Sequence, residues 1–171
     1  HYIITYMKVS VITATWNSGK TLCTTLDSVL SQSYPDIEHI IVDGGSTDNT
    51  MEIVREYEPR YNGRLRFISE PDKGLYDAMN KGIRMSTGEV VGILNSDDFY
   101  TSSDVVEKLE KELATNRVDA VYGDIHFVDG NGLGKCVRYY SSRLFHRSWM
   151  RLGFMPAHPS FYCRKIIYDK Y

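Results

Sequence analysis

The chain has 171 residues, 42% of them hydrophobic and 25% charged, which predicts one globular domain with a sizeable core and excludes a disordered chain. No apolar run approaches the roughly 18 residues of a membrane span, and the start lacks a signal-peptide pattern, so a cytoplasmic location is expected. Cys23, Cys136 and Cys163 are odd in number and include no Cys-x-x-Cys pair, which argues against a disulfide framework and a zinc site.

The net charge of −2 hides an asymmetry along the chain. Residues 1–129 carry 12 basic and 21 acidic side chains, hence −9, whereas residues 130–171 carry 8 basic and 1 acidic, hence +7. This pattern fits an acidic body with a basic flank that faces an anion, and it equally fits two oppositely charged surfaces that attract each other within one domain. Residues 1–6 precede a plausible initiator, Met7, and are left out of the fold argument as an added remnant.

The first half of the chain repeats a strand-then-helix pattern. Residues 8–14 read as an apolar strand, and the apolar positions from Leu22 to Leu30 recur at helical spacing, with Ser18 as a candidate N-cap. A second strand over 37–42 runs directly into Asp43 and two glycines. Three more helices are expected: one over 51–57 capped from residues 46–48, one with apolar positions from Leu75 to Ile83, and one from Val105 to Leu113 capped by Ser102 or Ser103. They alternate with strands expected over 64–69, 90–94 and 120–123.

This order predicts an α/β fold, namely a three-layer α/β/α sandwich around a mostly parallel sheet with right-handed crossovers. Ligands of such sheets bind outside the carboxyl ends of the strands. Polar clusters follow four of the predicted strands and so converge on one edge: residues 13–17, Asp43, residues 70–73, and the pair Asp97 and Asp98.

After Asp124 the pattern changes. Apolar stretches over 125–128 and 135–139 flank Asp-Gly and Asn-Gly pairs, which predicts an antiparallel hairpin added to the core. The basic and aromatic stretch 143–152 can be an amphipathic helix at a membrane or lipid-linked ligand, or a helix that packs its aromatic side chains onto the domain. A loop and strand over 155–162 and a helix at the end of the chain complete the expected elements.

The adjacent acids Asp97 and Asp98 suggest a cation site. Neither a G-x-G-x-x-G nor a P-loop motif is present, so phosphates would have to be held in another way. One or two carboxylates together with phosphate oxygens suit Mg²⁺ or Mn²⁺, which would act as a Lewis acid toward a leaving diphosphate. The alternative is a solvated turn that caps the next helix. Asp43 can accept a hydrogen bond from a base or ribose, or it can cap the helix that follows it.

Four motifs carry a family resemblance: Val-Ile-Thr-Ala-Thr-Trp-Asn at 11–17, Ile-Val-Asp-Gly-Gly-Ser-Thr-Asp at 41–48, Asp-Ala-Met-Asn-Lys-Gly at 77–82 and Asn-Ser-Asp-Asp at 95–98. Together they resemble glycosyltransferase family 2 from Met7 to about Asp124. The resemblance implies a GT-A (Rossmann-like) fold, a UDP- or GDP-sugar donor, Mn²⁺ or Mg²⁺, and inversion at the anomeric carbon. It also implies a saccharide or lipid-linked saccharide acceptor in surface polysaccharide assembly, action at the inner face of the membrane, and no nucleic-acid partner.

By motif position, Asp98 resembles the metal ligand and Asp97 the acid that contacts the ribose or the donor sugar. Asp43 resembles the residue that reads the nucleotide base. The other residues that the resemblance places on the donor side are Thr13, Asn17, Lys73 and Asp77. Residues 7–124 are therefore assigned to a nucleotide-sugar-binding core, and residues 125–171 to the start of an acceptor-side region of the same domain, cut short at Tyr171.

The chain departs from the family pattern in two ways. The metal motif has Asn95 and Ser96 in place of a first carboxylate. An inverting reaction needs a general base, which the family usually supplies as an acid beyond the central hairpin, yet no acid lies between Gly130 and Tyr168. Either Asp124 serves, or the base lies beyond Tyr171; the second is favoured and predicts donor binding with weak or no transfer.

Two other functions are compatible with the sequence. A sugar nucleotidyltransferase would be expected to have a Gly-rich, basic loop after the first strand, and residues 15–19 are poor in both features. A non-catalytic nucleotide-sugar-binding module is supported only by the missing base. His158 could complete a metal shell from the acceptor side, although a lone histidine before proline is more often a loop residue.

Overall fold

The computed structural model describes residues 6–129, 135–144 and 158–170. Its main sheet has the strand order β3-β2-β1-β4-β8-β5, and β6 and β7 form a second, two-stranded sheet. The strands are β1 (Val9–Thr15), β2 (Ile37–Asp43), β3 (Leu65–Ser69), β4 (Val90–Ile93), β5 (Ala120–Val121), β6 (Ile125–Val128), β7 (Cys136–Tyr140) and β8 (Tyr162–Arg164). The helices are α1 (Leu22–Leu30), α2 (Thr50–Tyr57), α3 (Leu75–Met85), α4 (Val105–Asn116) and α5 (Lys165–Lys170), with short 3₁₀ turns η1 (Glu58–Tyr61) and η4 (His158–Ser160).

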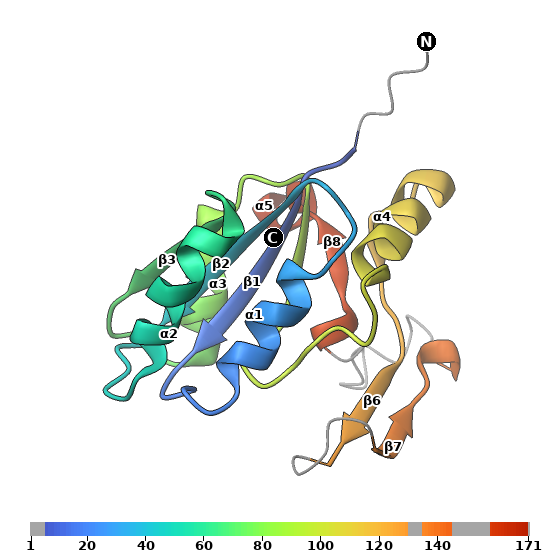
Figure 1. The fold of residues 1–171 in the computed structure, drawn as a ribbon. Helices are drawn as coiled ribbons and strands as arrows, with labels where there is room; N and C mark the ends of the chain where they lie inside the picture. The colour runs from blue at the N-terminus through green and yellow to red at the C-terminus, as the bar shows by residue number, and fades with distance from the viewer. Residues whose placement is uncertain (1–5, 130–134, 145–157, 171) are drawn as a thin grey trace.

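Helices cover both faces of the sheet, so the predicted three-layer sandwich is confirmed (Figure 1). One core cluster packs α1, α2 and α4 against the sheet, and a second packs α3, with Tyr168 of α5, against the opposite face. Because side chains alternate along a strand, Val11 of β1 belongs to the first cluster and Ile12 to the second. This two-sided burial explains why the sequences of β1, β2 and β4 are largely apolar and do not alternate strictly between apolar and polar residues.

The central strands are parallel, as predicted. β1 pairs with β2 on one side and with β4 on the other, and β2 pairs with β3. The strand β8 departs from this pattern, because it lies antiparallel between β4 and β5. Residues 162–164 thus return to the core sheet, although they come from the segment assigned to the acceptor side.

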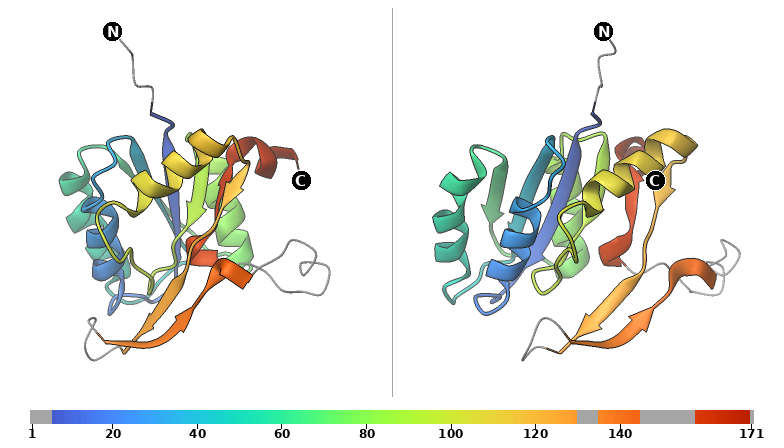
Figure 2. Two further views of the ribbon diagram at one scale, coloured as in Figure 1. Left: turned by 90° about the vertical axis from the view of Figure 1, so that its right-hand side faces the viewer. Right: turned by 45° about the vertical axis from the view of Figure 1, so that its right-hand side comes forward.

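The predicted hairpin is confirmed as β6 and β7, which pair antiparallel from Ile125 opposite Tyr140 to Val128 opposite Cys136. It projects beyond the edge of the sheet where the parallel strands end (Figure 2). All five side chains of β7 are exposed. The predicted turn between the two strands lies outside the described residues, and so does most of the basic and aromatic stretch 143–152.

Two predicted helix caps are wrong. Helix α1 starts after Thr21 without a side-chain cap, and the Ser18 hydroxyl instead donates to the Trp16 carbonyl at 3.3 Å. Helix α4 starts after Asp104, and neither Ser102 nor Ser103 caps it. Its Val106 N–H donates to the side-chain oxygen of Gln32 at 3.0 Å, so a residue that follows α1 satisfies the start of α4.

The start of α2 is closer to the prediction. Its N-cap position is Asn49, which makes no side-chain cap bond. The Asp48 carboxylate accepts from the Thr50 N–H at 3.0 Å and therefore satisfies one of the free backbone donors at this helix end.

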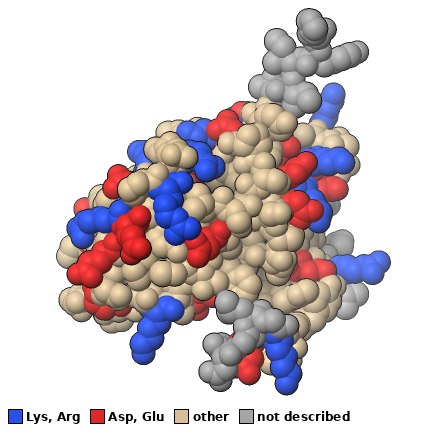
Figure 3. Space-filling view, viewed as in Figure 1, with Lys and Arg blue, Asp and Glu red and all other residues tan. Residues whose placement is uncertain are grey.

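Charged side chains of both signs are mixed on the face shown in Figure 3, where small groups of Lys or Arg lie next to Asp or Glu. The surface over α1 and α2 is therefore not a single-sign patch. Among the helices that the structure describes, none is long and apolar enough to cross a membrane.

Candidate active site

The loops that follow β1, β2 and β4 meet at one edge of the sheet. Thr15 at the end of β1 lies opposite Asp43 at the end of β2, and Ile12 of β1 lies opposite Ile93, the last residue of β4. Parallel strands place their carboxyl ends together, which is where open α/β sheets bind ligands. The structure thus brings the predicted polar clusters to a common edge.

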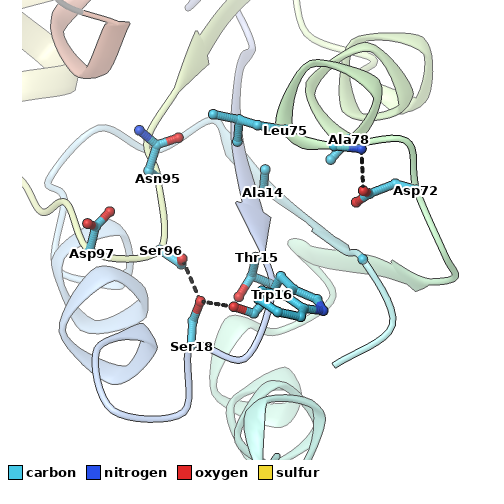
Figure 4. A pocket seen from close by; sticks show the side chains of 12 residues that line it. Ala14, Thr15, Trp16, Ser18, Asp72, Leu75, Ala78, Asn95, Ser96 and Asp97 are labelled. Carbon is cyan, nitrogen blue, oxygen red and sulfur yellow. Dashed lines mark hydrogen bonds between the residues drawn. The ribbon is translucent and has the colours of Figure 1, made fainter. Parts of the chain in front are cut away.

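A cavity of about 630 Å³ opens between these loops, a size suited to a small ligand (Figure 4). Asn95 and Asp97 stand on one side of it, and Trp16 and Asp72 on the other. Trp16 is 67% exposed, so much of its indole surface is available to a planar ligand. Two glycines, Gly44 and Gly74, contribute backbone to the wall.

The residues Asn95–Asp98, which we call the acid loop, form a tight turn after β4. The Asp98 N–H donates to the Asn95 carbonyl at 3.0 Å, and the Asn95 side-chain amide donates to the Asp98 carboxylate at 3.1 Å. Burial raises the pKa of Asp98, and the negative charge of Asp97 raises it further. Among the described residues, no Lys, Arg or His forms an ion pair with Asp98.

Helix α1 holds the acid loop from behind. The Thr25 hydroxyl, which is buried, donates to the Asp98 carbonyl at 2.7 Å. The hydroxyl groups of Ser18 and Ser96 lie 2.8 Å apart. Thr25 thus holds the loop backbone and Ser18 contacts its Ser96 side chain, while the Asp97 side chain stays exposed.

The acid loop fits a divalent cation. The side-chain oxygen of Asn95 is buried and has no hydrogen-bond partner among the described residues, and it belongs to the amide that contacts Asp98. Carboxylate and amide oxygens are ligands of Mg²⁺ and Mn²⁺. Within the described ranges no three His, Cys, Asp or Glu side chains are grouped to hold an ion. An ion here would complete its shell with water and phosphate oxygens.

The predicted donor-binding residues Thr13 and Asp43 are fully buried. The Asp43 carboxylate accepts from the backbone N–H groups of Gly45 and Ser46 at 3.2 and 3.0 Å and from the Ser69 hydroxyl at 2.6 Å. The Thr13 hydroxyl donates to a backbone carbonyl in the core. In this structure Asp43 shapes the loop after β2, and Thr13 supports the core behind the acid loop.

Asn17 connects the loops that follow β1 and β2. Its backbone adopts a left-handed conformation with φ of 49°, which asparagine tolerates better than most residues. Its side-chain oxygen accepts from the Thr47 N–H at 2.8 Å, and its own N–H donates to the Ser46 hydroxyl at 2.7 Å. Asn17 therefore sets the shape of the cavity rim.

Lys73 and Asp77 lie at the start of α3. The Asp77 carboxylate accepts from the Lys73 N–H at 3.1 Å, a bond that lowers the pKa of Asp77, and Lys81 lies 3.5 Å away from it. Asp77 thus satisfies a free backbone donor at this helix end. The Lys73 side chain is exposed.

Asp124, the base considered from the sequence, is held by the hairpin. Its carboxylate accepts from the Tyr139 hydroxyl, and from the Ser142 N–H and hydroxyl at 2.7 Å each. These bonds lower the pKa of Asp124 to about 2. A carboxylate with so little proton affinity is a poor general base.

A second cavity of about 790 Å³ lies between the acid loop, α4 and the hairpin. Asn95 and Asp97 line both cavities, so the two spaces meet at the acid loop. His158, at the start of η4, lines the second cavity together with Asp98 and Asp124.

Two residues of the first cavity, Trp16 and Asp72, lie in the clusters predicted at the binding edge but were not among the predicted site residues. Trp16 is an aromatic residue in a polar loop directly after a strand, which is a usable signal for a ligand contact. Asp72 lies so close to Gly44 that a Cβ there would be 2.6 Å from the Asp72 carboxylate. That contact joins loops far apart in sequence, and no local pattern reveals it.

The family model described as "Glycosyl transferase family 2" matches residues 10–169. The chain belongs to glycosyltransferase family 2. The chain is 36% identical over 117 residues to the PGL/p-HBAD biosynthesis glycosyltransferase of Mycobacterium bovis (strain BCG / Pasteur 1173P2). This match covers 68% of the chain and 46% of the relative. An uncharacterized glycosyltransferase of Nostoc sp. is 33% identical over 125 residues, which are 73% of the chain and 38% of the relative.

Solved structures agree with this membership. The mannosyltransferase PcManGT from Pyrobaculum calidifontis, in complex with GDP-Man and Mn²⁺, is 31% identical with a TM-score of 0.65, covering 70% of the family 2 chain and 36% of its own. Staphylococcus aureus TarS 1–349, in complex with UDP-GlcNAc, has a TM-score of 0.76 at 22% identity, and the match covers 96% of the chain and 47% of TarS. At this identity the likeness establishes only a shared fold. The predicted GT-A fold is confirmed. The chain spans less than half the length of each of these four proteins.

Proposed function

We propose that this chain carries the donor and metal site of an enzyme that transfers a sugar from a nucleoside-diphosphate sugar to a hydroxyl group, with inversion. The observation that carries the proposal is the position of the acid loop, where two cavities meet at Asn95 and Asp97. A sugar bound in the first cavity would present its anomeric carbon to an acceptor in the second. Family membership supports the transferase class.

The first cavity is proposed to take the nucleotide. Trp16 offers a stacking surface for the base, a contact that is tolerant of base identity, so UDP- and GDP-sugars are both candidates. Solved structures of similar fold hold one or the other, since PcManGT was solved with GDP-Man and TarS with UDP-GlcNAc. Asp97 would contact the ribose or the sugar. Asn17 and Asp43 would influence donor binding through the shape of the loops after β1 and β2. Lys73 and Asp77 would lie beside the donor at the start of α3.

Asp98 is proposed to bind Mn²⁺ or Mg²⁺, together with phosphate oxygens of the donor. The ion would supply Lewis-acid stabilisation of the leaving diphosphate. Asn95 would hold the Asp98 carboxylate through its side-chain N–H, and its side-chain oxygen has no hydrogen-bond partner among the described residues. The Mn²⁺ in the PcManGT complex supports this assignment.

The second cavity is proposed to take the acceptor, a saccharide or a lipid-linked saccharide. The positive charge of residues 130–171 would favour a reaction at the anionic inner face of a membrane. Asp124 is not the proposed base, because its hydrogen bonds keep its pKa low. A glycan product fits the biosynthesis role in the name of the Mycobacterium relative.

Calorimetry with UDP and GDP, each with and without Mn²⁺, tests the donor and metal site. We expect Mn²⁺-dependent binding of one nucleotide, and at least a tenfold loss of affinity in Asp98→Asn, because that variant removes the charge with little change of shape. The matched control is Asp27→Asn, which removes an exposed carboxylate on α1. Its ion pair with Arg60 contributes little to stability because both side chains are exposed.

Nucleotide binding that is indifferent to Mn²⁺ and to Asp98→Asn would contradict the metal assignment. Binding without any sugar transfer to simple acceptors would favour the alternative, a non-catalytic nucleotide-sugar-binding module. If neither nucleotide binds, the whole proposal fails.

A further inference from the structure

His39 lies fully buried in β2, and both of its ring nitrogens contact hydroxyl groups. Its Nε2 lies 2.9 Å from the Thr13 hydroxyl, and its Nδ1 lies 3.0 Å from the Tyr61 hydroxyl. These hydroxyls reach two backbone carbonyls in turn, Thr13 that of Leu94 at 2.7 Å and Tyr61 that of Leu26 at 2.6 Å. One row of hydrogen bonds thus runs from α1 through the sheet to the residue just before the acid loop.

This row has fewer hydrogens than contacts. Burial lowers the pKa of His39 to about 3, so its ring is neutral and carries one N–H. Thr13 and Tyr61 contribute one O–H each. Three hydrogens therefore serve four contacts, and one contact must lack a hydrogen. Which one it is depends on the ring nitrogen that carries the proton.

The two tautomers leave different acceptors without a hydrogen. With the proton on Nε2, the ring donates to Thr13, Thr13 donates to Leu94, and the Tyr61 hydroxyl can serve the bare Nδ1 or the Leu26 carbonyl. With the proton on Nδ1, the ring donates to Tyr61, Tyr61 donates to Leu26, and the single Thr13 hydrogen must serve either the bare Nε2 or the Leu94 carbonyl.

The two carbonyls are not equivalent. Leu26 lies inside α1, so its carbonyl also accepts the backbone bond of the next helical turn. Leu94 is 1% exposed and lies just past the end of β4, and among the described residues Thr13 is the donor to its carbonyl. In the Nδ1-protonated state either the Leu94 carbonyl or Nε2 has no donor, whereas in the Nε2-protonated state Tyr61 can serve Nδ1 and the Leu26 carbonyl keeps its helix bond. Leaving a buried acceptor without any donor costs more than removing a second bond from one that is already paired. The Nε2-protonated state is therefore favoured.

We infer that His39 is a positioning residue, protonated on Nε2, which orients the Thr13 hydroxyl toward the Leu94 carbonyl and so fixes where the acid loop begins. The inference deepens the proposed function and rests on it for its consequence, which is tighter binding of metal and nucleotide. Without the orienting N–H, the start of the loop would have to be ordered when the ligand binds, and that ordering would weaken affinity.

The test uses two variants that each remove one hydroxyl from the same row. Thr13→Val should weaken Mn²⁺-dependent nucleotide binding by about fivefold, the factor that corresponds to one net hydrogen bond. Thr13→Ser, which keeps the hydroxyl, should restore it. Tyr61→Phe should lower thermal stability but leave the affinity within about twofold. Long-range ¹H–¹⁵N NMR spectra of the wild type and Tyr61→Phe should show a protonated Nε2 on His39 and a bare Nδ1.

A wild-type His39 protonated on Nδ1 would overturn the inference whatever the nucleotide does. Equal losses of affinity in Thr13→Val and Tyr61→Phe would also overturn it, because a purely structural role predicts no difference between the two ends. If the wild type binds no nucleotide, the proposed function fails, whereas the NMR spectra still decide the tautomer.

Discussion

Asp97 and Asp98 are neighbours in sequence but differ in environment. Asp97 is exposed and lines both cavities, whereas Asp98 is partly buried against Asn95. Burial and the charge of Asp97 both raise the pKa of Asp98, so a cation at this carboxylate would gain from relief of repulsion as well as from direct attraction.

Trp16 should contribute to nucleotide binding through stacking. We expect Trp16→Ala to weaken binding of the nucleotide by about tenfold, since base–aromatic stacking contributes roughly 1–3 kcal/mol per base. Trp16→Phe should retain most of the affinity. Tyr140→Ala, which removes an exposed aromatic side chain of the hairpin, serves as the control in the same titration. Unchanged affinity in Trp16→Ala would place the base elsewhere.

The residues at the strand ends could be predicted, but their exposure could not. Asp43 and Thr13 are polar residues at the ends of apolar runs, and such residues usually face a ligand or solvent. Their burial depends on partners distant in sequence, namely Ser69 for Asp43 and His39 for Thr13. A local pattern holds no information about those partners.

At the level of elements, β8 fits against β4 because Gly92 has no side chain. The ring of Tyr162 lies where a Cβ on Gly92 would be, at 2.0 Å from the nearest ring carbon. The Tyr162 hydroxyl meets that of Tyr100, which follows the acid loop, and both rings are buried. The pairing of β4 with β8 therefore depends on this one glycine.

Gly92→Ala should displace the Tyr162 ring and destabilise the fold by about 2 kcal/mol, a typical cost of overpacking a core. Urea denaturation measures the change. The matched control is Gly123→Ala, where an added Cβ would make only an ordinary contact at 3.9 Å. Equal urea midpoints for the two variants would show that the ring can move without cost.

The longer elements were predictable because their periodicity is strong. The runs of β1, β2 and β4 and the amphipathic helix α3 were all placed within two residues of their observed bounds. The antiparallel strand β8 was not expected in the core sheet, since it has three residues and no periodicity of its own. The cap of α4 was missed for a similar reason, because Gln32 reaches it from another element.

The amino ends of the central strands are joined by a buried carboxylate, whereas the first cavity lies at their carboxyl ends. Glu38, near the start of β2, accepts from the Ser10 hydroxyl and the Thr87 N–H at 2.6 Å each, and it pairs with Lys8 at 3.2 Å. Its side chain is 5% exposed. This buried carboxylate joins β1, β2 and the turn before β4 at the edge away from the acid loop.

Glu38 should make stability depend on pH. Burial opposes its ionisation, but the hydrogen bonds from Ser10 and Thr87 outweigh burial and lower its pKa. A lowered folded pKa gives stability that is present above the unfolded pKa, about 4.3, and that is lost as the pH falls toward the folded value. We expect Glu38→Gln to cost about 2 kcal/mol at pH 7.

Urea denaturation of the wild type and Glu38→Gln at pH 7 and pH 4 tests this dependence. The difference between the two proteins should shrink at the lower pH, because part of the wild-type carboxylate is then protonated in the unfolded chain. A difference that stays constant would mean that Glu38 contributes through packing alone.

The position of β8 has a consequence for how the protein folds during synthesis. Strand β4 carries the acid loop at its end, but the strand that covers its free edge is residues 162–164, about 70 positions later. Until those residues leave the ribosome, the apolar edge of β4 is open to pairing with other chains. Such a distant pairing also slows folding. The strand that presents the acids is thus protected only after residues 162–164 are made, and chaperones or low temperature should improve the yield of folded protein.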